Sequence, residues 1–278
     1  MEALRGLSLH RGARNLEDDC AVLEFGSETL VITHDSMAEG THWPESADPF
    51  DVAWKLVAVN LSDLAAAGAE PIGVMLAYSL GDSDGDGRFI EGLRAVLDTY
   101  DAPLLGGDTI RADGPRTLGL TAIGRATHTP VPSRSGAKVG DGVFVTGDLG
   151  QAMLGHEGIE AHREAFVRPI PLLETGRALA AVATAMMDIS DGLLLDATRL
   201  AKASEVTLSL ENAAIPVADR ARFDDCIRWG DDYQLLFTAP SGANLPIRAH
   251  RIGEVTARSD APILLDGAPV VGSLGYQH

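Results

Sequence analysis

Hydrophobic positions along the chain alternate between the spacing of a strand and the spacing of a helix. Short runs rich in β-branched residues, such as "TLVIT" at 29–33, predict strands. Longer stretches with apolar residues three and four apart predict helices between them. Strands are expected at 29–33, 73–80, 102–108, 117–124, 143–147, 185–189, 206–210 and 233–239, and helices within 48–71 and at 87–100, 149–156, 171–183 and 192–204. This alternation predicts an α/β protein built from mixed α and β layers.

The first of these helices has the clearest boundaries. Asp48 suits its N-cap, and Pro49 suits its first turn because a proline there loses no helical hydrogen bond. Gly68 is typical of a residue just past the helix end. Asn60 and Asp63 lie three residues apart, so they share a face of the helix that is separate from its apolar face. The helix therefore packs by one face and carries an amide and an acid on another.

The length of 278 residues is typical of two domains. The stretch 125–142 is polar and contains prolines, which indicates a connection between two alternating halves. We expect an N-terminal domain at 1–127 and a C-terminal α/β domain at 128–278 that completes a shared site.

Charge and cysteine content limit the possible partners and the compartment. A formal net charge of −18 argues against nucleic acid as a partner, because such a surface needs a basic stripe. The chain has no apolar run of 18 residues and no apolar segment of the signal-peptide type, so no membrane association is expected. Cys20 and Cys226 stand far apart and outside any CxxC spacing, which favours a reducing, cytoplasmic environment.

Aspartates interrupt or follow several apolar runs, as in "EDDCAVL", "VITHDSM", "LLGGDTIR" and "MMDISDG". Each one alone is better interpreted as a helix cap or a turn residue than as a functional acid. Together they indicate a site, because strand ends and helix starts converge on one crevice in α/β layers. Converging carboxylates repel one another unless a cation lies between them. Hard oxygen ligands suit Mg²⁺ or Ca²⁺, and Mg²⁺ is commonly shared with substrate phosphates, so the pattern predicts a phosphate ligand that binds with metal.

The ordinary nucleotide-binding signatures are absent from the sequence. There is no GxxxxGK[ST], no GxGxxG after a strand, and no protein-kinase motif set. "GDSDGDG" at 81–87 begins like a calcium loop, but its twelfth position is Leu93, so we expect a solvated turn. Arg134 in "SRSGAKVGDG" suits a phosphate clamp or an ordinary surface position. His42 and Trp43 suit either a ring-stacking site or a buried structural pair.

The order of these motifs resembles that of the thiamine-monophosphate kinases, in the superfamily of aminoimidazole ribonucleotide synthetase and selenophosphate synthetase. The resemblance covers about residues 17–240 and rests on "DDCAVL", "EGTHW", "VNLSDLAAAGAEP", "GGDTIR", "RSGAKVGDG", "DISDG" and "GDDYQLLFT". It implies two α/β domains, of which the first binds ATP and Mg²⁺ and pairs with a second copy into a homodimer. It also implies transfer of the γ-phosphoryl group of ATP to thiamine monophosphate.

The resemblance also implies roles for particular residues. Six aspartates match the metal ligands, with His34 beside them at the position of a hydroxyl ligand, and three of the six match the acids that act in catalysis. The metal ligands are then Asp19, His34, Asp35, Asp63, Asp108, Asp188 and Asp191, the catalytic acids Asp35, Asp108 and Asp191, the nucleotide contacts Thr33, Gly107, Asp108, Arg134 and Ser190, and the thiamine-phosphate contacts His42, Asp231 and Tyr276. The acceptor is itself an ionised phosphate, so the reaction needs positioning and charge neutralisation but no general base.

Three departures from the family pattern bear on the acceptor half of the site. Glu17 replaces a glycine, His34 replaces a hydroxyl residue, and the family's Gly-Gly-Glu-Asp-Tyr-Glu becomes Trp229 to Gln234, with Asp231 in place of glutamate. Two alternatives therefore stay open. One is an ATP-dependent synthetase of the same superfamily, and the other is a nucleotide-binding relative without catalysis.

Overall fold

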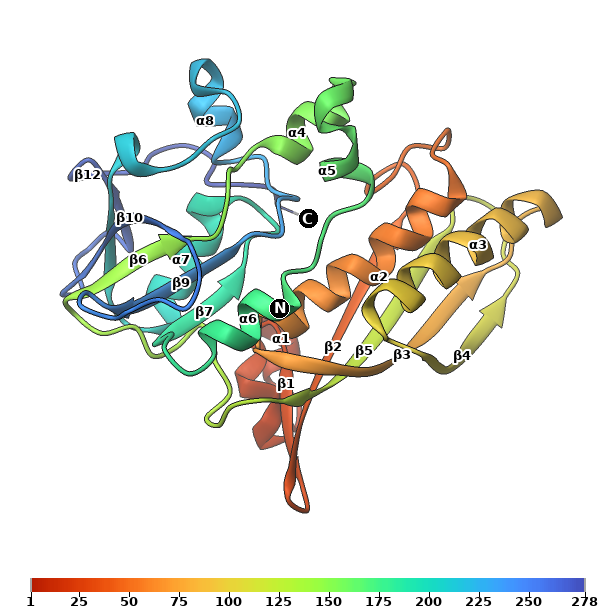
Figure 1. Cartoon of the computed structure of the whole chain (residues 1–278), viewed down its shortest axis with the longest axis horizontal. Helices are drawn as coiled ribbons and strands as arrows, with labels where there is room; N and C mark the ends of the chain where they lie inside the picture. Colours follow the sequence, from red (N-terminus) through yellow and green to blue (C-terminus); the bar gives the residue numbers. More distant parts are fainter. Residues whose placement is uncertain (1, 278) are drawn as a thin grey trace.

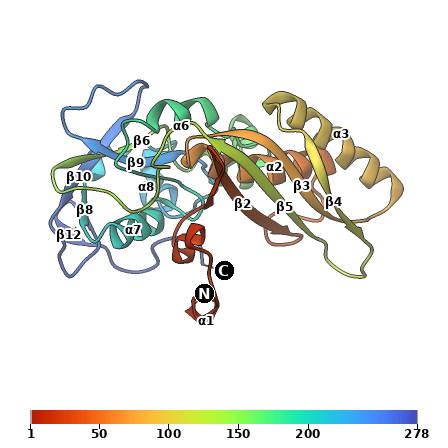
Figure 2. The ribbon, with the colours of Figure 1, turned by 90° about the horizontal axis from the view of Figure 1, so that it is seen from below.

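The computed structural model describes residues 2–277, which form two β-sheets with helices packed on them (Figure 1). The first sheet contains only strands from the N-terminal half of the chain, and the second contains only strands from the C-terminal half. The two sheets lie side by side, and the view turned by 90° shows them at opposite ends of an elongated molecule (Figure 2). The predicted mixture of α and β layers is confirmed. The division at 127/128 stays a proposal.

The five-stranded sheet has one face covered by two helices. Its order is β1-β2-β5-β3-β4, and the neighbours are antiparallel except for the parallel pair β3 and β4. Helices α2 and α3 both lie on the same side of the sheet (Figures 1 and 2). Among residues 2–277 no α-helix covers the opposite, open side of β5, β3 and β4, and the 3-10 helix η1 contacts the sheet at β1. The bounds are β1 Ala21–Phe25, β2 Glu28–Ala38, β3 Ala69–Ser79, β4 Leu104–Ile110, β5 Thr117–Ala126, α2 Pro49–Ala66 and α3 Ser83–Tyr100.

Helix α2 lies at the centre of the molecule, and nearly all of its residues are buried. Its N-cap is Asp48, whose carboxylate accepts a hydrogen bond from the Phe50 N–H at 3.0 Å, as the sequence predicted. One side of α2 packs on the sheet through Leu56, Leu61 and Leu64, which are fully buried. Another side contacts the C-terminal half, where α5, α6 and β7 pack on it. Because α2 contacts both halves of the chain, polar residues such as Asp63 lie where the two halves meet.

The seven-stranded sheet is mixed, with the order β12-β11-β8-β10-β6-β9-β7. Its own core includes Ile189, Leu193 and Leu208, all fully buried. Strand β7 lies at the edge nearest α2, so its last residue, Asp188, faces the junction between the halves. The strands are β6 Asp141–Val145, β7 Ala185–Asp188, β8 Thr207–Leu210, β9 Leu235–Pro240, β10 His250–Thr256, β11 Ile263–Leu265 and β12 Ala268–Pro269.

Short helices complete the C-terminal half and the N-terminal segment. The α-helices are α1 Glu2–Arg5, α4 Gln151–His156, α5 Arg163–Val167, α6 Leu173–Leu179, α7 Leu193–Ala203 and α8 Phe223–Cys226, and the 3-10 helices are η1 Arg11–Leu16, η2 Glu160–His162, η3 Asn212–Ala214 and η4 Arg220–Arg222. None of the helices in residues 2–277 combines the length and apolar character that crossing a bilayer requires.

The structure differs from the sequence-based expectation in several regions. The stretch 81–87, expected to be a solvated turn, contains the start of α3, because the Asp82 carboxylate accepts hydrogen bonds from the N–H groups of Asp84 and Gly85 at 3.1 and 2.8 Å and caps the helix. Strands β1 and β10 to β12 were not predicted. Strand β10 contains a glycine and charged residues, and β11 and β12 have only three and two residues, too few to show an alternation.

Candidate functional site at the junction of the two halves

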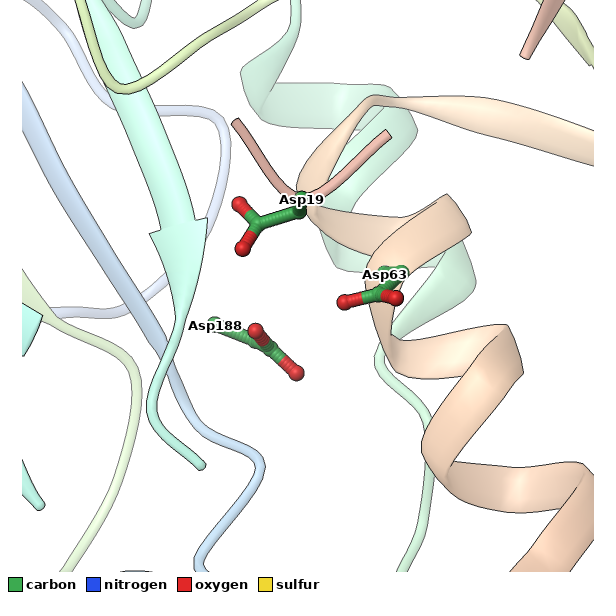
Figure 3. Close-up of side chains that lie close together, drawn as sticks. All are labelled: Asp19, Asp63 and Asp188. Carbon is green, nitrogen blue, oxygen red and sulfur yellow. The ribbon is translucent and has the colours of Figure 1, made fainter. Parts of the chain in front are cut away.

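Three carboxylates converge where the two halves of the chain meet. Asp19 comes from the loop before β1, Asp63 from α2, and Asp188 from the end of β7. One oxygen of each lies within 4.8 Å of an oxygen of the others, and Figure 3 shows the side chains pointing toward one another. We call these three residues the acidic cluster. They are 44 and 125 residues apart along the chain, so only the tertiary fold brings them together.

Neighbouring side chains fix the orientation of each acid in the cluster. The Thr33 hydroxyl donates a hydrogen bond to Asp63, and the Ser62 hydroxyl donates to Asp188 at 2.6 Å. Arg134 forms an ion pair with Asp19 and donates a hydrogen bond to it. Thr33 therefore holds a member of the cluster by its hydroxyl, and it lies behind the cluster, away from the pocket wall.

The three carboxylates of the acidic cluster need a cation beside them if all three are to be ionised. Burial raises the pKa of Asp63 and Asp188 well above the usual range of a carboxyl, and the other carboxylates nearby raise each of them further. Burial also raises the pKa of Asp19, although Arg134 opposes this effect. Buried carboxylates in such proximity ionise together only if a cation neutralises them. Three hard oxygen donors with no sulfur or imidazole among them fit Mg²⁺ or Ca²⁺.

Asp35 extends the site along strand β2. Its backbone N–H donates to the Asn60 side-chain oxygen at 2.9 Å, and the Asn60 amide donates to the Leu56 carbonyl at 2.9 Å. Asn60 is fully buried, so this amide of α2 ties the helix to β2 at the position of Asp35. Asp35 lines the same pocket as the acidic cluster. The Asn60 and Asp63 face predicted from the sequence therefore looks onto the site.

A buried acid holds the loop that follows β7. Asp196 is fully buried and accepts hydrogen bonds from the N–H groups of Ser190 and Asp191 at 3.1 and 3.0 Å. Arg199 donates to Asp196 at 2.7 Å and to Asp191 at 2.6 Å. Burial raises the pKa of Asp196 to about 7, while Arg199 opposes that rise. Asp196 therefore fixes the segment from Asp188 to Asp191, which carries two of the predicted ligands.

A second loop packs directly against that segment. Gly230 has φ +91°, and a Cβ there would lie 2.5 Å from the Ser190 carbonyl oxygen, so the close approach requires glycine. Asp231 follows in the left-handed region, with its N–H bonded to the same carbonyl at 2.8 Å. From the C-terminus, the Tyr276 N–H donates to the Asp191 carbonyl at 2.9 Å. These contacts bring Asp231 and Tyr276 beside the acidic cluster.

The acidic cluster borders one cavity of about 1100 Å³, together with Asp35, Asp191, Asp231 and Tyr276. Its walls combine the acids with several basic side chains, so it is suited to anions that carry metal ions between them and the protein. The predicted residues on its wall are Asp19, Asp35, His42, Asp63, Arg134, Asp188, Ser190, Asp191, Asp231 and Tyr276, and its basic residues are Arg5, Lys55, Arg134, Arg199, Lys202 and Arg228.

Four predicted residues do not border this cavity within one chain. One is Thr33, predicted as a nucleotide contact, whose hydroxyl instead donates to Asp63 behind the cluster. His34 alternates with Thr33 and Asp35 along β2 and therefore points to the other face of the sheet, where its ring contacts Thr121 at 2.8 Å and Ser36 at 3.2 Å. The structure thus corrects the prediction of His34 as a ligand of this site. Gly107 and Asp108 lie on β4, the far edge of the sheet, and Asp108 is exposed.

The sequence alone missed several residues of the site. Lys55 is 5% exposed, lines the cavity and forms an ion pair with Asp231. Lys55 could have been found from its spacing, because it lies eight residues before Asp63 and therefore on the same face of α2. Asp196 lies within the apolar run that follows Gly192, but its function of accepting hydrogen bonds from two loop N–H groups depends on the fold. Ser62 gave no signal, because a serine beside an apolar face is common.

The raised pKa values predict that acid stabilises the metal-free protein. A carboxyl whose pKa is raised by folding holds its proton more tightly in the folded chain, so the free energy of unfolding falls as pH rises above about 4. Burial raises the pKa of Asp196 to about 7 and that of Asp232 to about 8, and the acidic cluster adds to the effect. Urea unfolding in chelator is therefore expected to show stability that falls from pH 5 to pH 8, by up to about 1.4 kcal/mol per pH unit for each group losing its proton. If an Asp188→Asn variant lost stability with rising pH as steeply as wild type, the acidic cluster would not contribute to this pH dependence.

Comparison with known proteins relates this geometry to a family. Residues 17–126 match the N-terminal domain of AIR synthase related proteins. The chain is 37% identical to the thiamine-monophosphate kinase of Salmonella typhimurium, over 94% of this chain and 90% of that protein. It is 34% identical to the enzyme of the same name from Methanospirillum hungatei, over 96% and 94%.

Solved structures show the same relationship. The structure of AaThiL complexed with AMPPCP and TMP superposes with a TM-score of 0.85 at 28% identity, covering 96% of this chain and 94% of that one. Thiamine-monophosphate kinase from Stenotrophomonas maltophilia gives a TM-score of 0.80 at 35% identity, covering 91% and 90%. The HypE–HypF complex, at 17% identity and a TM-score of 0.74, shares the fold.

Proposed function

Because this chain belongs to the thiamine-monophosphate kinase family, we infer that it transfers the γ-phosphoryl group of ATP to thiamine monophosphate, giving thiamine diphosphate and ADP. The observation that carries this function is the acidic cluster, which faces basic side chains across one cavity at the junction of the two halves. A site of this kind suits two phosphorylated substrates that meet with metal ions. The site therefore suits the transfer of a phosphoryl group from one anionic substrate to another.

The reaction needs little acid–base chemistry from the protein. The attacking oxygen belongs to a phosphate that is already ionised at neutral pH, so its nucleophile requires no general base. The terminal P–O bond of ATP breaks as the new P–O–P bond forms, and ADP leaves with the electron pair. The protein contributes alignment of the two substrates and stabilisation of charge. We propose that Arg134 contacts the donor, and its pairing with Asp19 at the cavity wall supports this assignment.

The residues of the acidic cluster fit Mg²⁺ as the metal. Asp19, Asp63 and Asp188 would hold it, and Asp35 and Asp191 border the same cavity and extend the ligand set. The donor set is made of carboxylate oxygens whose burial demands a cation, which is the chemistry Mg²⁺ prefers. When bound, Mg²⁺ would supply positive charge that neutralises the phosphates. The protein side chains bind and orient that charge.

Other wall residues are assigned to the two substrates. Arg134 and Ser190 are proposed as nucleotide contacts, and His42, Asp231 and Tyr276 as acceptor contacts. Each borders the cavity, and the Nδ1 atom of His42 accepts a hydrogen bond from the Ala38 N–H at 2.9 Å, which fixes the ring. We propose a cytoplasmic location, consistent with the free thiols of both cysteines.

A coupled assay tests the function. The protein is incubated with ATP, thiamine monophosphate and varied Mg²⁺, and the products are identified by mass. We expect equal amounts of thiamine diphosphate and ADP, and loss of both with chelator. ADP formed only with an amide or ribonucleotide acceptor would favour the synthetase alternative. Tight ATP binding without product would favour a relative without catalysis, although His34, which had supported that alternative, lies away from the cavity.

We also propose that two copies pair through the open face of the five-stranded sheet. Met75, Leu105 and Ile110 are 45%, 53% and 54% exposed on β3 and β4, which is apolar area that a second copy would cover. Because Asp108 and Gly107 do not border the cavity of their own chain, we propose that they act at the cavity of the partner copy.

Subunit complementation tests this arrangement. Asp63→Asn and Asp108→Asn variants are expected to be inactive separately and to regain activity when they are unfolded and refolded together, because one mixed site then contains both native acids. Failure of the mixture, with dimers of normal mass in light scattering, would place Asp108 outside the partner's site. Single-chain mass in light scattering would contradict the dimer itself.

A further inference from the structure

Three aromatic side chains form one wall of the cavity, and nothing above assigns them a function. The ring centroids of His156 and Phe166 are 5.1 Å apart, those of His156 and Trp229 are 5.3 Å apart, and those of Phe166 and Trp229 are 6.2 Å apart. All three border the cavity. We call them the aromatic wall. Trp229 stands where the family pattern described above has glycine.

The aromatic wall is held in place from two sides. Trp229 packs against Met153 and Cys226, which are buried. The helix that carries Phe166 is anchored to α2, because the buried Asp51 accepts hydrogen bonds from Arg163 at 2.5 Å and Arg168 at 2.6 Å. An aromatic surface fixed by packing and by a buried ion pair is preorganised for a flat ligand.

Two charged side chains, Lys55 and Asp231, lie beside the aromatic wall and contact each other. The Lys55 ammonium lies 4.1 Å from the centroid of the Phe166 ring and forms an ion pair with Asp231. Asp231 also accepts a hydrogen bond from the Tyr233 hydroxyl at 2.9 Å. Each carboxylate oxygen has room for a second donor. Asp231 is therefore fixed next to the wall, with capacity left for a donor on a ligand.

Helix α2 sets the distance from the wall to the acidic cluster. Lys55, Val59 and Asp63 are four residues apart in succession, and all three border the cavity. Eight residues of α-helix span about 12 Å. A ligand whose phosphate lies at Asp63 and whose ring lies at the wall would thus extend along α2 for about that length. Arg134 lies beside the acidic cluster through its pair with Asp19.

We propose that the aromatic wall is the subsite for the ring end of the acceptor, and that Trp229 makes the enzyme selective for a phosphate ester carrying a flat, cationic or amino-bearing aromatic ring. The inference rests on the proposed function and specifies which side chains recognise the acceptor. A positively charged ring is attracted to the face of tryptophan, and Asp231 accepts a hydrogen bond from a ring amino group. The donor nucleotide then lies on the Arg134 side of the cluster.

The test compares Trp229→Leu and Trp229→Phe with wild type in steady-state kinetics. Leucine is expected to raise KM for thiamine monophosphate about tenfold or more and to leave kcat and KM for ATP within about twofold, because the lost contact is the same in the ground and transition states. Phenylalanine keeps a ring and is expected to restore most of the affinity. Trp54→Phe is the matched control, because Trp54 packs against Tyr100 and does not border the cavity.

The outcomes separate this inference from the proposed function. An active wild type with unchanged KM values in Trp229→Leu would overturn the aromatic wall and leave the function intact. A rise in KM for ATP alone would assign the wall to the nucleotide ring and overturn the inference as well. A wild type that forms no thiamine diphosphate would contradict the function. Tryptophan fluorescence then tests the wall in a Trp43→Phe, Trp54→Phe background, because Trp43 also borders the cavity and Trp229 is then the one tryptophan left of three. Quenching by thiamine monophosphate in that background supports the wall, and unchanged fluorescence overturns it.

Discussion

Replacing Asp63 by asparagine is expected to lower kcat by about a thousandfold while leaving the metal-free protein at least as stable as wild type. The variant removes one of three carboxylates that hold the metal, and loss of a direct ligand exceeds the roughly 10- to 100-fold cost of losing a supporting residue. It also relieves repulsion, because the pKa of Asp63 is raised by burial and by the neighbouring acids. Activity and stability should therefore move in different directions.

The measurements are kcat at saturating substrates and the melting temperature with chelator and with Mg²⁺. Wild type should be stabilised by Mg²⁺, since a ligand that binds only the folded state raises its stability, and Asp63→Asn should lose most of that increase. Asp98→Asn, an exposed acid on α3, is the control and should behave as wild type. A parallel loss of activity and of metal-free stability would assign Asp63 a structural function instead.

Replacing Asp196 by alanine is expected to cost about 3 kcal/mol of folding stability and most of the activity. The Ser190 and Asp191 N–H groups would lose their acceptor, and Arg199 would keep only its contact with Asp191. The segment that carries Asp188 and Asp191 would then no longer be held at the cavity, although no ligand is removed. This result would show that the site depends on a residue outside its metal ligands.

Urea unfolding and metal-dependent kinetics distinguish this effect from simple destabilisation. The Mg²⁺ concentration for half-maximal activity should rise in Asp196→Ala at a temperature where the variant is fully folded. Asp196→Asn keeps an acceptor oxygen and should retain more of both properties. Asp260→Ala removes an exposed acid from the same half of the chain and should change neither. Unaltered metal dependence in folded Asp196→Ala would mean that the loop keeps its position without this acid.

Local chemistry explains why much of the fold was predictable. Helix α2 was recognised from Asp48, Pro49 and its apolar spacing, because a cap and a periodic face act within a few residues. The start of α3 was missed because Asp82 belongs to a sequence that serves equally well as a turn. The alternation of β2 was enough to separate Asp35 from His34, yet the family pattern had placed both at the metal. In that case the periodicity of the strand was the better guide.

The sequence by itself determined the types of elements, the acids available for a metal and the resemblance that indicated a phosphoryl-transferring kinase. Which acids meet was decided only by the tertiary structure. Asp19, Asp63 and Asp188 converge because the loop before β1, helix α2 and the end of β7 meet where the two halves join, whereas Asp108 lies on an edge strand away from them. The aromatic wall and the Asp196 loop depend on the same packing. Propensity and periodicity act between residues close in the chain, while a binding site is made of contacts between residues far apart in it.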